Sequence, residues 1–205
     1  MNKVQVSCLG KMGRFGNQLF QYAFAKSYAD KYNCVLEVPN DWIGRKIFKI
    51  EDDVITHPLP KTDLDEIPFG ETDIDLYGFF QHQKFLNIMD ANKVKEWFTF
   101  KEEIIDSFVK PKDFYVAAHL RHGDYVYADH YCTISLECYI NACKKNGYDV
   151  GDLILVSEEH RQPTDSGNLN IEHNGENCNF LYDFLVLVNS DVLFRSNSTF
   201  GWWAA

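Results

Sequence analysis

Apolar and polar residues along this chain form short runs that follow one another in a regular order. Residues 4–9 alternate as in a strand and lead into a glycine-rich turn at 10–16. From Leu19 the apolar residues keep helical spacing to about Ala29, and residues 34–38 predict the next strand. The order strand, turn, helix, strand is typical of the start of a parallel α/β sheet.

The same order returns after a middle section with little periodicity. Residues 39–70 are rich in Pro and Asp and predict loops, whereas residues 85–108 predict one or two surface helices. The near-continuous apolar run 114–120 predicts a buried parallel strand. The pattern further predicts helices at 135–145 and 179–188 and strands at 153–157 and 191–195.

Two α/β lobes are therefore predicted, an N-terminal lobe of residues 1–110 and a C-terminal lobe of residues 111–205. Pro111-Lys112-Asp113 lies at the expected boundary. Polar turns follow the predicted strands, and ligands of open α/β sheets bind at the carboxyl ends of strands. We expect the functional residues in those turns.

Composition and charge exclude several kinds of partner. A chain that is 45% hydrophobic can bury a core, and a formal charge of -10 disfavours nucleic acid and anionic membranes, because phosphate binding needs a basic face. The N-terminus is too short and polar for a signal peptide, and no stretch supplies the roughly 18 apolar residues of a membrane helix. We therefore expect a cytoplasmic protein with at most peripheral membrane contact.

The cysteines predict neither a disulfide framework nor a zinc site. No CxxC pair and no Cys/His spacing of the zinc-site kind occurs among the six. We expect all of them to be buried free thiols. They are Cys8, Cys34, Cys132, Cys138, Cys143 and Cys178.

The first candidate site is the turn Gly13-Arg14-Phe15-Gly16-Asn17-Gln18. Its glycines allow a tight turn, and the helix that follows presents free N–H groups to an anion. The spacing fits neither GxGxxG nor a P-loop, so a purely structural turn is an equal alternative.

The second candidate is His119-Leu120-Arg121-His122-Gly123-Asp124-Tyr125, at the end of a predicted buried strand. The planar fork of Arg121 can grip diphosphate oxygens and stabilise a leaving nucleotide. In the alternatives, Arg121 pairs with Asp124 and fastens the turn, and His119 is a hydrogen-bonded core histidine.

The third candidate is the segment 196–203, Ser-Asn-Ser-Thr-Phe-Gly-Trp-Trp. Hydroxyl residues between a strand and an apolar helix act as N-caps, and the same groups can hold a phosphate. The alternative is a helix cap followed by a buried Trp pair.

In this order the segments resemble the alpha-1,2-fucosyltransferases of glycosyltransferase family 11. The resemblance implies a GT-B-like fold of two Rossmann-like lobes with parallel sheets. It further implies an inverting, metal-independent transfer of fucose from GDP-fucose to a glycan hydroxyl, with the donor in the C-terminal lobe. The similar stretches are GRFGNQLFQYAFA at 13–25, GFFQ at 78–81, HLRHGDY at 119–125, ISLECYINAC at 134–143 and NSTFGWWAA at 197–205.

The resemblance also implies roles for single residues. Arg121 would grip the donor diphosphate, and Asp124 would be the catalytic base or would orient Arg121. The pair Ser157-Glu158 lies where related enzymes have a Ser/Thr-Asp pair that contacts guanine. The implied substrate-binding residues are Gly13, Arg14, Gly16, Asn17, Gln18, His119, His122, Gly123, Ser157, Glu158, Asn197, Ser198, Thr199 and Phe200.

Several positions depart from the family pattern. His122 replaces a second arginine with a group that titrates near neutrality, and Glu158 is one methylene longer than the usual Asp. The Asp-x-Asp segments at 63–65 and 73–75 follow no evident buried strand, so we expect them to hold no cation.

The chain ends at Ala205, where family members continue, which suggests either a compact form or a C-terminal truncation. Two alternatives to a glycan alpha-1,2-fucosyltransferase stay open. One is a protein O-fucosyltransferase-like or other nucleotide-sugar transferase, and the other is an inactive GDP-sugar binder.

Overall fold

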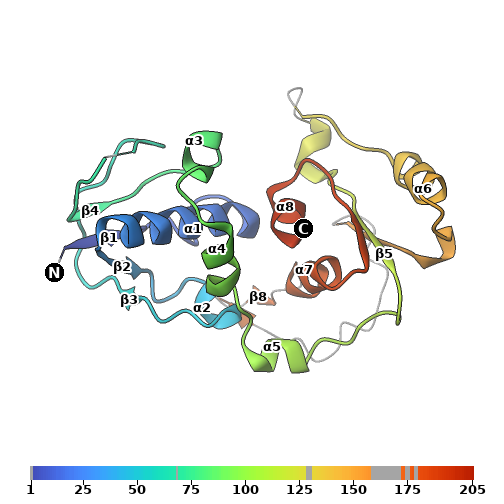
Figure 1. The fold of residues 1–205 in the computed structure, drawn as a ribbon, viewed down its shortest axis with the longest axis horizontal. Helices are drawn as coiled ribbons and strands as arrows, with labels where there is room; N and C mark the ends of the chain where they lie inside the picture. Colours follow the sequence, from blue (N-terminus) through green and yellow to red (C-terminus); the bar gives the residue numbers. More distant parts are fainter. Residues whose placement is uncertain (1, 68, 128–130, 158–171, 174–175, 178–179) are drawn as a thin grey trace. The chain divides into compact units, whose positions relative to one another are not determined.

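The computed structural model describes residues 2–67, 69–127, 131–157, 172–173, 176–177 and 180–205, with Asp124 and residues 172–173 and 176–177 described by their backbone alone. The chain divides into two compact units, Met1–Ile105 and Asp106–Ala205 (Figure 1). Each unit holds a parallel sheet. The predicted boundary, between residues 110 and 111, falls inside the second unit.

The sheet of the first unit has the order β3-β2-β1-β4, and all of its strands are parallel. The long helix α1 (Phe15–Tyr32) connects β1 to β2 and packs on both, as its apolar spacing predicted. It ends at Asn33, whose φ of 52° lies in the left-handed region that asparagine tolerates. The strands are β1 (Lys3–Gln5), β2 (Val35–Val38), β3 (Asp53–Val54) and β4 (Ile74–Asp75).

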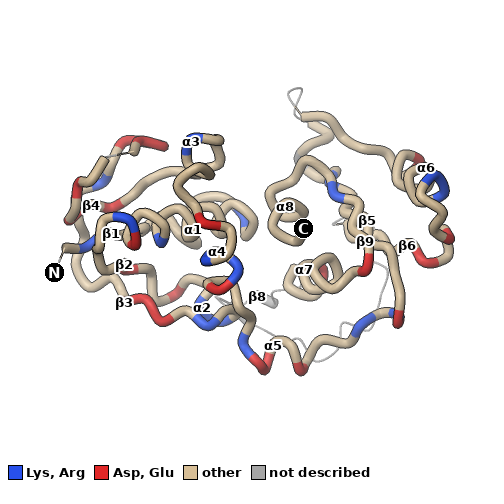
Figure 2. Tube along the Cα trace, viewed as in Figure 1, with Lys and Arg blue, Asp and Glu red and all other residues tan. Residues whose placement is uncertain are grey.

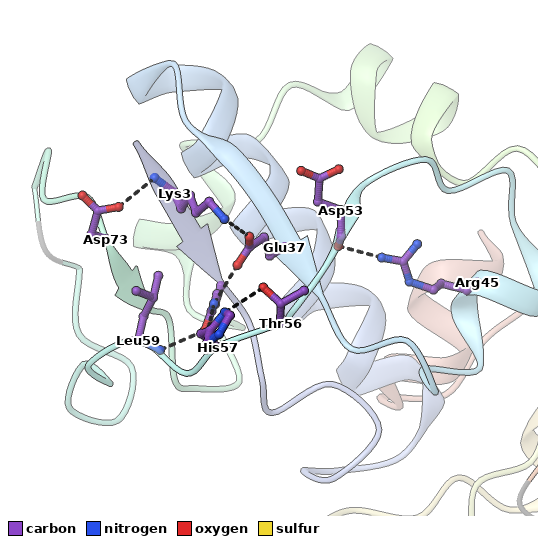
Figure 3. Close-up of polar contacts among 9 residues, drawn as sticks. Lys3, Glu37, Arg45, Asp53, Thr56, His57, Leu59 and Asp73 are labelled. Carbon is purple, nitrogen blue, oxygen red and sulfur yellow. Dashed lines mark hydrogen bonds and ion pairs between the residues drawn. The ribbon is translucent and has the colours of Figure 1, made fainter. Parts of the chain in front are cut away.

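A polar network lies on one face of this sheet, under the loop that follows β3 (Figure 3). Gln5 Nε2 donates to Glu37 Oε2 and to the His57 carbonyl, each at 2.7 Å, and Leu59 N donates to Gln5 Oε1 at 3.1 Å. Lys3 Nζ also binds Glu37. Burial raises the pKa of Glu37, but the hydrogen bonds from Lys3 and Gln5 outweigh it, and the pKa is lowered.

The region 85–108, predicted to form one or two surface helices, contains two short helices and the end of a third that begins before it. They are separated because Asp90 caps α4 by accepting from Asn92 N, and Phe100 leaves the helical path to bridge Phe48. These helices are α3 (Gln83–Leu86), α4 (Ala91–Trp97) and α5 (Glu102–Asp106), and α2 (Gly44–Ile47) precedes them.

The sheet of the second unit has the order β6-β5-β9, also parallel, with β5 in the centre. Val116, Ala117 and Ala118 of β5 are fully buried, which agrees with the predicted buried strand. The elements are β5 (Val116–His119), η1 (Gly123–Tyr127), α6 (Leu136–Lys145), η2 (Val150–Asp152), β6 (Leu153–Val156), an antiparallel pair of β7 (Glu172–His173) and β8 (Glu176–Asn177), α7 (Phe180–Val188), β9 (Val192–Phe194) and α8 (Thr199–Ala204).

The expectation that every cysteine is buried is wrong for Cys132 and Cys138, which are exposed, and Cys34 is half-buried. Cys138 lies on the solvent side of α6, whereas Cys143 of the same helix is buried in the core. Burial raises the pKa of Cys8 to about 11. Cys178 lies outside the described residues.

Charged residues of both signs are interspersed along both units (Figure 2). Within the described part of the chain, no helix combines the length and apolarity needed to span a bilayer.

Candidate functional site

The three strands of the parallel sheet in the second unit end at one edge of that sheet, and polar residues follow each of them. Arg121 comes two residues after β5, Ser157 comes directly after β6, and Ser196 comes two residues after β9. Leu120 N donates to the Val156 carbonyl at 2.9 Å, so pairing continues to the residues just before Arg121 and Ser157. Arg121 and Ser157 therefore leave neighbouring strands side by side.

His119, the last residue of β5, joins this edge to the turn after β9. Its Nδ1 lies 3.2 Å from Ser196 Oγ, and its ring centroid lies 5.4 Å from that of Phe200. Its carbonyl accepts a hydrogen bond from Tyr139 Oη at 2.9 Å. The predicted residues His119 and Phe200, 81 positions apart in the sequence, are thus brought into contact in a buried setting.

The turn after β9 directs alternate side chains inward. Ser196 and Ser198 are buried, Asn197 is exposed, and Thr199 and Phe200 are half-buried. The predicted N-cap is confirmed, because Ser198 Oγ accepts from Phe200 N at 3.2 Å at the start of α8.

Gly201 lets α8 approach the end of β5. A Cβ at this position would lie 2.9 Å from His119 Nδ1 and 3.4 Å from Arg195 Cβ. Any larger residue would therefore press on the histidine that faces Ser196.

Arg121 is only 9% exposed, and its Cζ lies 4.7 Å from the centroid of the Tyr125 ring. Gly123, with a φ of 39°, turns the chain, and Tyr125 N donates to the His122 carbonyl at 2.7 Å. The Tyr125 ring stacks in turn on Tyr131, with centroids 3.9 Å apart and planes 6° apart.

Two further predicted residues border this turn. His122 Nε2 lies 3.2 Å from the Ile134 carbonyl, so its ring fastens the turn to the segment before α6. The backbone of Asp124 belongs to η1, but its side chain lies outside the described part of the structure, as does all of Glu158. The roles of both acidic residues stay predictions.

The other predicted residues lie in the first unit, at the start of α1. Gln18 is buried there. Its Nε2 donates to the Gly13 carbonyl at 3.2 Å, and its Oε1 accepts from Trp42 Nε1 at 2.9 Å. Gly13 has a φ of +74°, and a Cβ on it would lie 2.5 Å from Asn17 Nδ2. Arg14 is exposed, and Gly16 is buried in the first turn of α1.

Asn17 connects this turn to the segment 78–81, since its Oδ1 accepts from Gln81 Nε2 at 2.9 Å. Asp65 anchors the same segment, because its Oδ1 accepts from Phe79 N at 2.7 Å and from Phe80 N at 2.8 Å. A Cβ on Gly78 would lie 2.3 Å from that oxygen, which explains the glycine.

Three aspartates of the two Asp-x-Asp segments, Asp65, Asp73 and Asp75, thus bind the protein's own backbone. Asp73 Oδ1 accepts from Lys3 N at 3.2 Å, and Asp75 accepts from Ser7 N at 2.8 Å and Ser7 Oγ at 2.6 Å. Over the residues whose positions are described, no group of three or more His, Cys, Asp or Glu side chains is arranged to hold a metal ion.

Several residues that contact the predicted ones directly or through one neighbour, in the second unit and around Asn17 in the first, were not among the predicted binding residues. Tyr125 and Gln81 lie in the quoted motifs, and Ser196 directly precedes NSTFGWW, so adjacency could have suggested them. Tyr131 and the packing role of Gly201 carry no signal in the sequence, because their contacts join residues that only the folded chain brings together.

The sequence matches no known family model, and no curated protein matches it significantly. Solved structures do share its fold. NodZ alpha-1,6-fucosyltransferase co-crystallised with GDP aligns with a TM-score of 0.55 and 14% identity, covering 99% of this chain and 91% of NodZ. NodZ soaked with GDP-fucose gives a TM-score of 0.51 with the same identity and coverage. The apo form of POFUT1 gives 0.53 and 13% identity, covering 99% and 93% of the two chains. The predicted GT-B-like α/β fold is confirmed.

Proposed function

We propose that this protein is a fucosyltransferase that transfers fucose from GDP-fucose to a hydroxyl group. The observation that carries the proposal is the position of Arg121, which leaves the central strand of the second sheet beside Ser157 and next to the turn that holds Ser196 and Ser198. The fold shared with NodZ, which has been crystallised with GDP and soaked with GDP-fucose, supports the same donor.

The chemistry of the leaving group fits this edge of the sheet. As the bond to fucose breaks, negative charge grows on the terminal phosphate of GDP. A buried guanidinium stabilises that charge more strongly than an exposed one, and its planar fork matches phosphate oxygens. The chain has a net charge of -10, so the positive charge next to the phosphate has to come from a local group such as Arg121.

In the proposed reaction, the acceptor oxygen attacks the anomeric carbon of fucose from the side opposite GDP. The new C–O bond forms while the bond to the phosphate oxygen breaks, so the configuration at that carbon inverts. The acceptor proton passes to a base, for which Asp124 is the candidate, and the electron pair leaves with GDP next to Arg121. We assign the stabilisation of the leaving group to Arg121 and to no metal ion.

For the acceptor, we propose a glycan hydroxyl and an alpha-1,2 linkage. The resemblance of HLRHGDY and NSTFGWW to glycan alpha-1,2-fucosyltransferases supports this choice. The similar TM-scores for NodZ and POFUT1 keep a second candidate, transfer to another glycan position or to a protein hydroxyl. The proposal places GDP-fucose recognition, in either case, at Arg121.

The test combines GDP calorimetry with a GDP-release assay that uses GDP-fucose and a panel of glycan and protein acceptors. We expect Arg121→Ala to lower kcat/KM by about 10²- to 10³-fold, the effect of removing one such donor. Lys144→Ala, which removes a positive charge from the exposed face of α6, is the matched control and should behave as wild type.

The outcomes separate the candidates. Full activity in Arg121→Ala refutes the assignment of the site, and a wild-type protein that does not bind GDP refutes the function. GDP binding without turnover on any acceptor would support an inactive GDP-sugar binder. The linkage of any product, determined by NMR, decides between alpha-1,2 transfer and the second candidate.

A further inference from the structure

Arg121 belongs to a column of three side chains in which two tyrosine rings lie behind the guanidinium. Its Cζ is 4.7 Å from the Tyr125 ring centroid, and the Tyr125 ring stacks on Tyr131 with centroids 3.9 Å apart and planes 6° apart. Exposure increases along the column, because Arg121 is buried, Tyr125 is half-buried and Tyr131 is 43% exposed.

The backbone builds this column from residues that are close in sequence. Gly123, at the start of η1, has a φ of 39°, and Tyr125 N donates to the His122 carbonyl at 2.7 Å, so the chain turns directly after His122. His122 fastens the turn through the Ile134 carbonyl, and Ile134 packs on the core cluster around Leu120 and Tyr139. The turn that carries Tyr125 is therefore anchored to the core.

The contact with Tyr125 restricts the motion of the guanidinium. The ring attracts the cation through its quadrupole, and it adds no opposite charge of its own to the site. A prepositioned donor also loses less conformational entropy when its ligand binds.

We propose that Tyr125 is a positioning residue for Arg121, that Tyr131 supports it from behind, and that the column prepares the guanidinium for a nucleoside diphosphate. The inference rests on the proposed function, since it assumes that GDP binds at Arg121. It goes further because it assigns affinity and turnover to two rings that need not touch the nucleotide.

The test compares Tyr125→Phe, which keeps the ring, with Tyr125→Leu, which removes it. Calorimetry should show GDP affinity within about twofold of wild type for Tyr125→Phe and about tenfold weaker for Tyr125→Leu, the range expected for a partly desolvated cation–π contact. Tyr127→Leu is the matched control, because Tyr127 lies in the same turn and is 90% exposed. It should bind GDP as wild type does.

A second readout follows Arg121 directly. In ¹H–¹⁵N spectra the ring current of Tyr125 should shift the Nε–H signal of Arg121, identified by its loss in Arg121→Lys. The shift should persist in Tyr125→Phe and vanish in Tyr125→Leu. Should Tyr125→Leu fail to fold, Tyr131→Leu replaces it, with GDP affinity about threefold weaker because the remaining ring has lost its support.

The possible results are distinguishable. If wild type binds GDP and Tyr125→Leu binds it equally well, the positioning role is wrong while the proposed function stands. If wild type does not bind GDP, both fall, and an intact ring-current shift would then mark the column as purely structural.

Discussion

The close approach of α8 to His119 gives a prediction about stability. Whether Gly201→Ala stabilises or destabilises the protein depends on one contact. In Gly201→Ala the new Cβ would lie 2.9 Å from His119 Nδ1, closer than real Cβ contacts, so the ring or the helix must move. The ring has little room, because it lies against Ser196 and Phe200, and the His119 backbone is held by the Tyr139 hydroxyl. Overpacking of this kind costs about 2 to 3 kcal/mol, and the helix propensity of Ala returns about 1 kcal/mol, so the free energy of unfolding should fall by about 1 to 2 kcal/mol.

Urea denaturation followed by the fluorescence of Trp202 and Trp203, which directly follow Gly201, measures this change. The control is the same substitution in a His119→Ala background. There the imidazole is gone, and the next contact, 3.4 Å to Arg195 Cβ, is ordinary packing. Gly201→Ala should then stabilise the protein by up to about 1 kcal/mol. An equal loss of stability in both backgrounds would refute the reasoning, since it would show that the His119 ring is not what the added methyl group meets.

Two further predictions concern the first unit. Asp65→Ala should lower the free energy of unfolding by about 1 to 3 kcal/mol, because Phe79 N and Phe80 N lose their acceptor. Asp65→Asn keeps one oxygen as an acceptor, so its free energy of unfolding should fall by less. Thermal denaturation measures both variants, and equal losses of stability would contradict the role of the carboxylate oxygen. For Glu37, whose pKa is lowered in the folded protein, the stabilisation relative to Glu37→Gln should be full above the usual value of 4.5 and decline as pH falls through the lowered pKa. Urea denaturation between about pH 3 and pH 7 follows that difference, and a difference that grows as the pH falls would contradict the direction of the shift.

The elements that the sequence predicted correctly are those with a long or uniform local pattern. The helical spacing from Leu19 to Ala29 lies within α1, and the apolar run 114–120 contains β5. Such segments bury one face or both faces along their length, so the periodicity itself records the burial. The sequence of the strand β4 shows no such periodic pattern. The strand has only Ile74 and Asp75, and it forms because β1 offers unpaired backbone groups beside it.

In the candidate site, too, local sequence pointed to some residues and could not assign a role to others. Arg121 and the segment 196–203 could be selected as candidates from the sequence, because their residue types suit phosphate binding and they follow predicted strands; their role in binding stays a prediction. Sequence alone could not choose between His119 as a ligand-site residue and as a core residue. The structure places it in a buried contact with Ser196, 77 residues away, which only the adjacent positions of β5 and β9 in the sheet bring about.

Local pattern thus determined which segments become helices and strands and which chemical groups follow them, because hydrophobic periodicity and residue type are properties of neighbouring positions. Tertiary structure decided what those groups touch. The column behind Arg121, the space that Gly201 leaves for His119 and the carboxylate of Asp65 under Phe79 and Phe80 depend on distances between segments. Those distances follow from strand order, from turns with positive φ and from close packing.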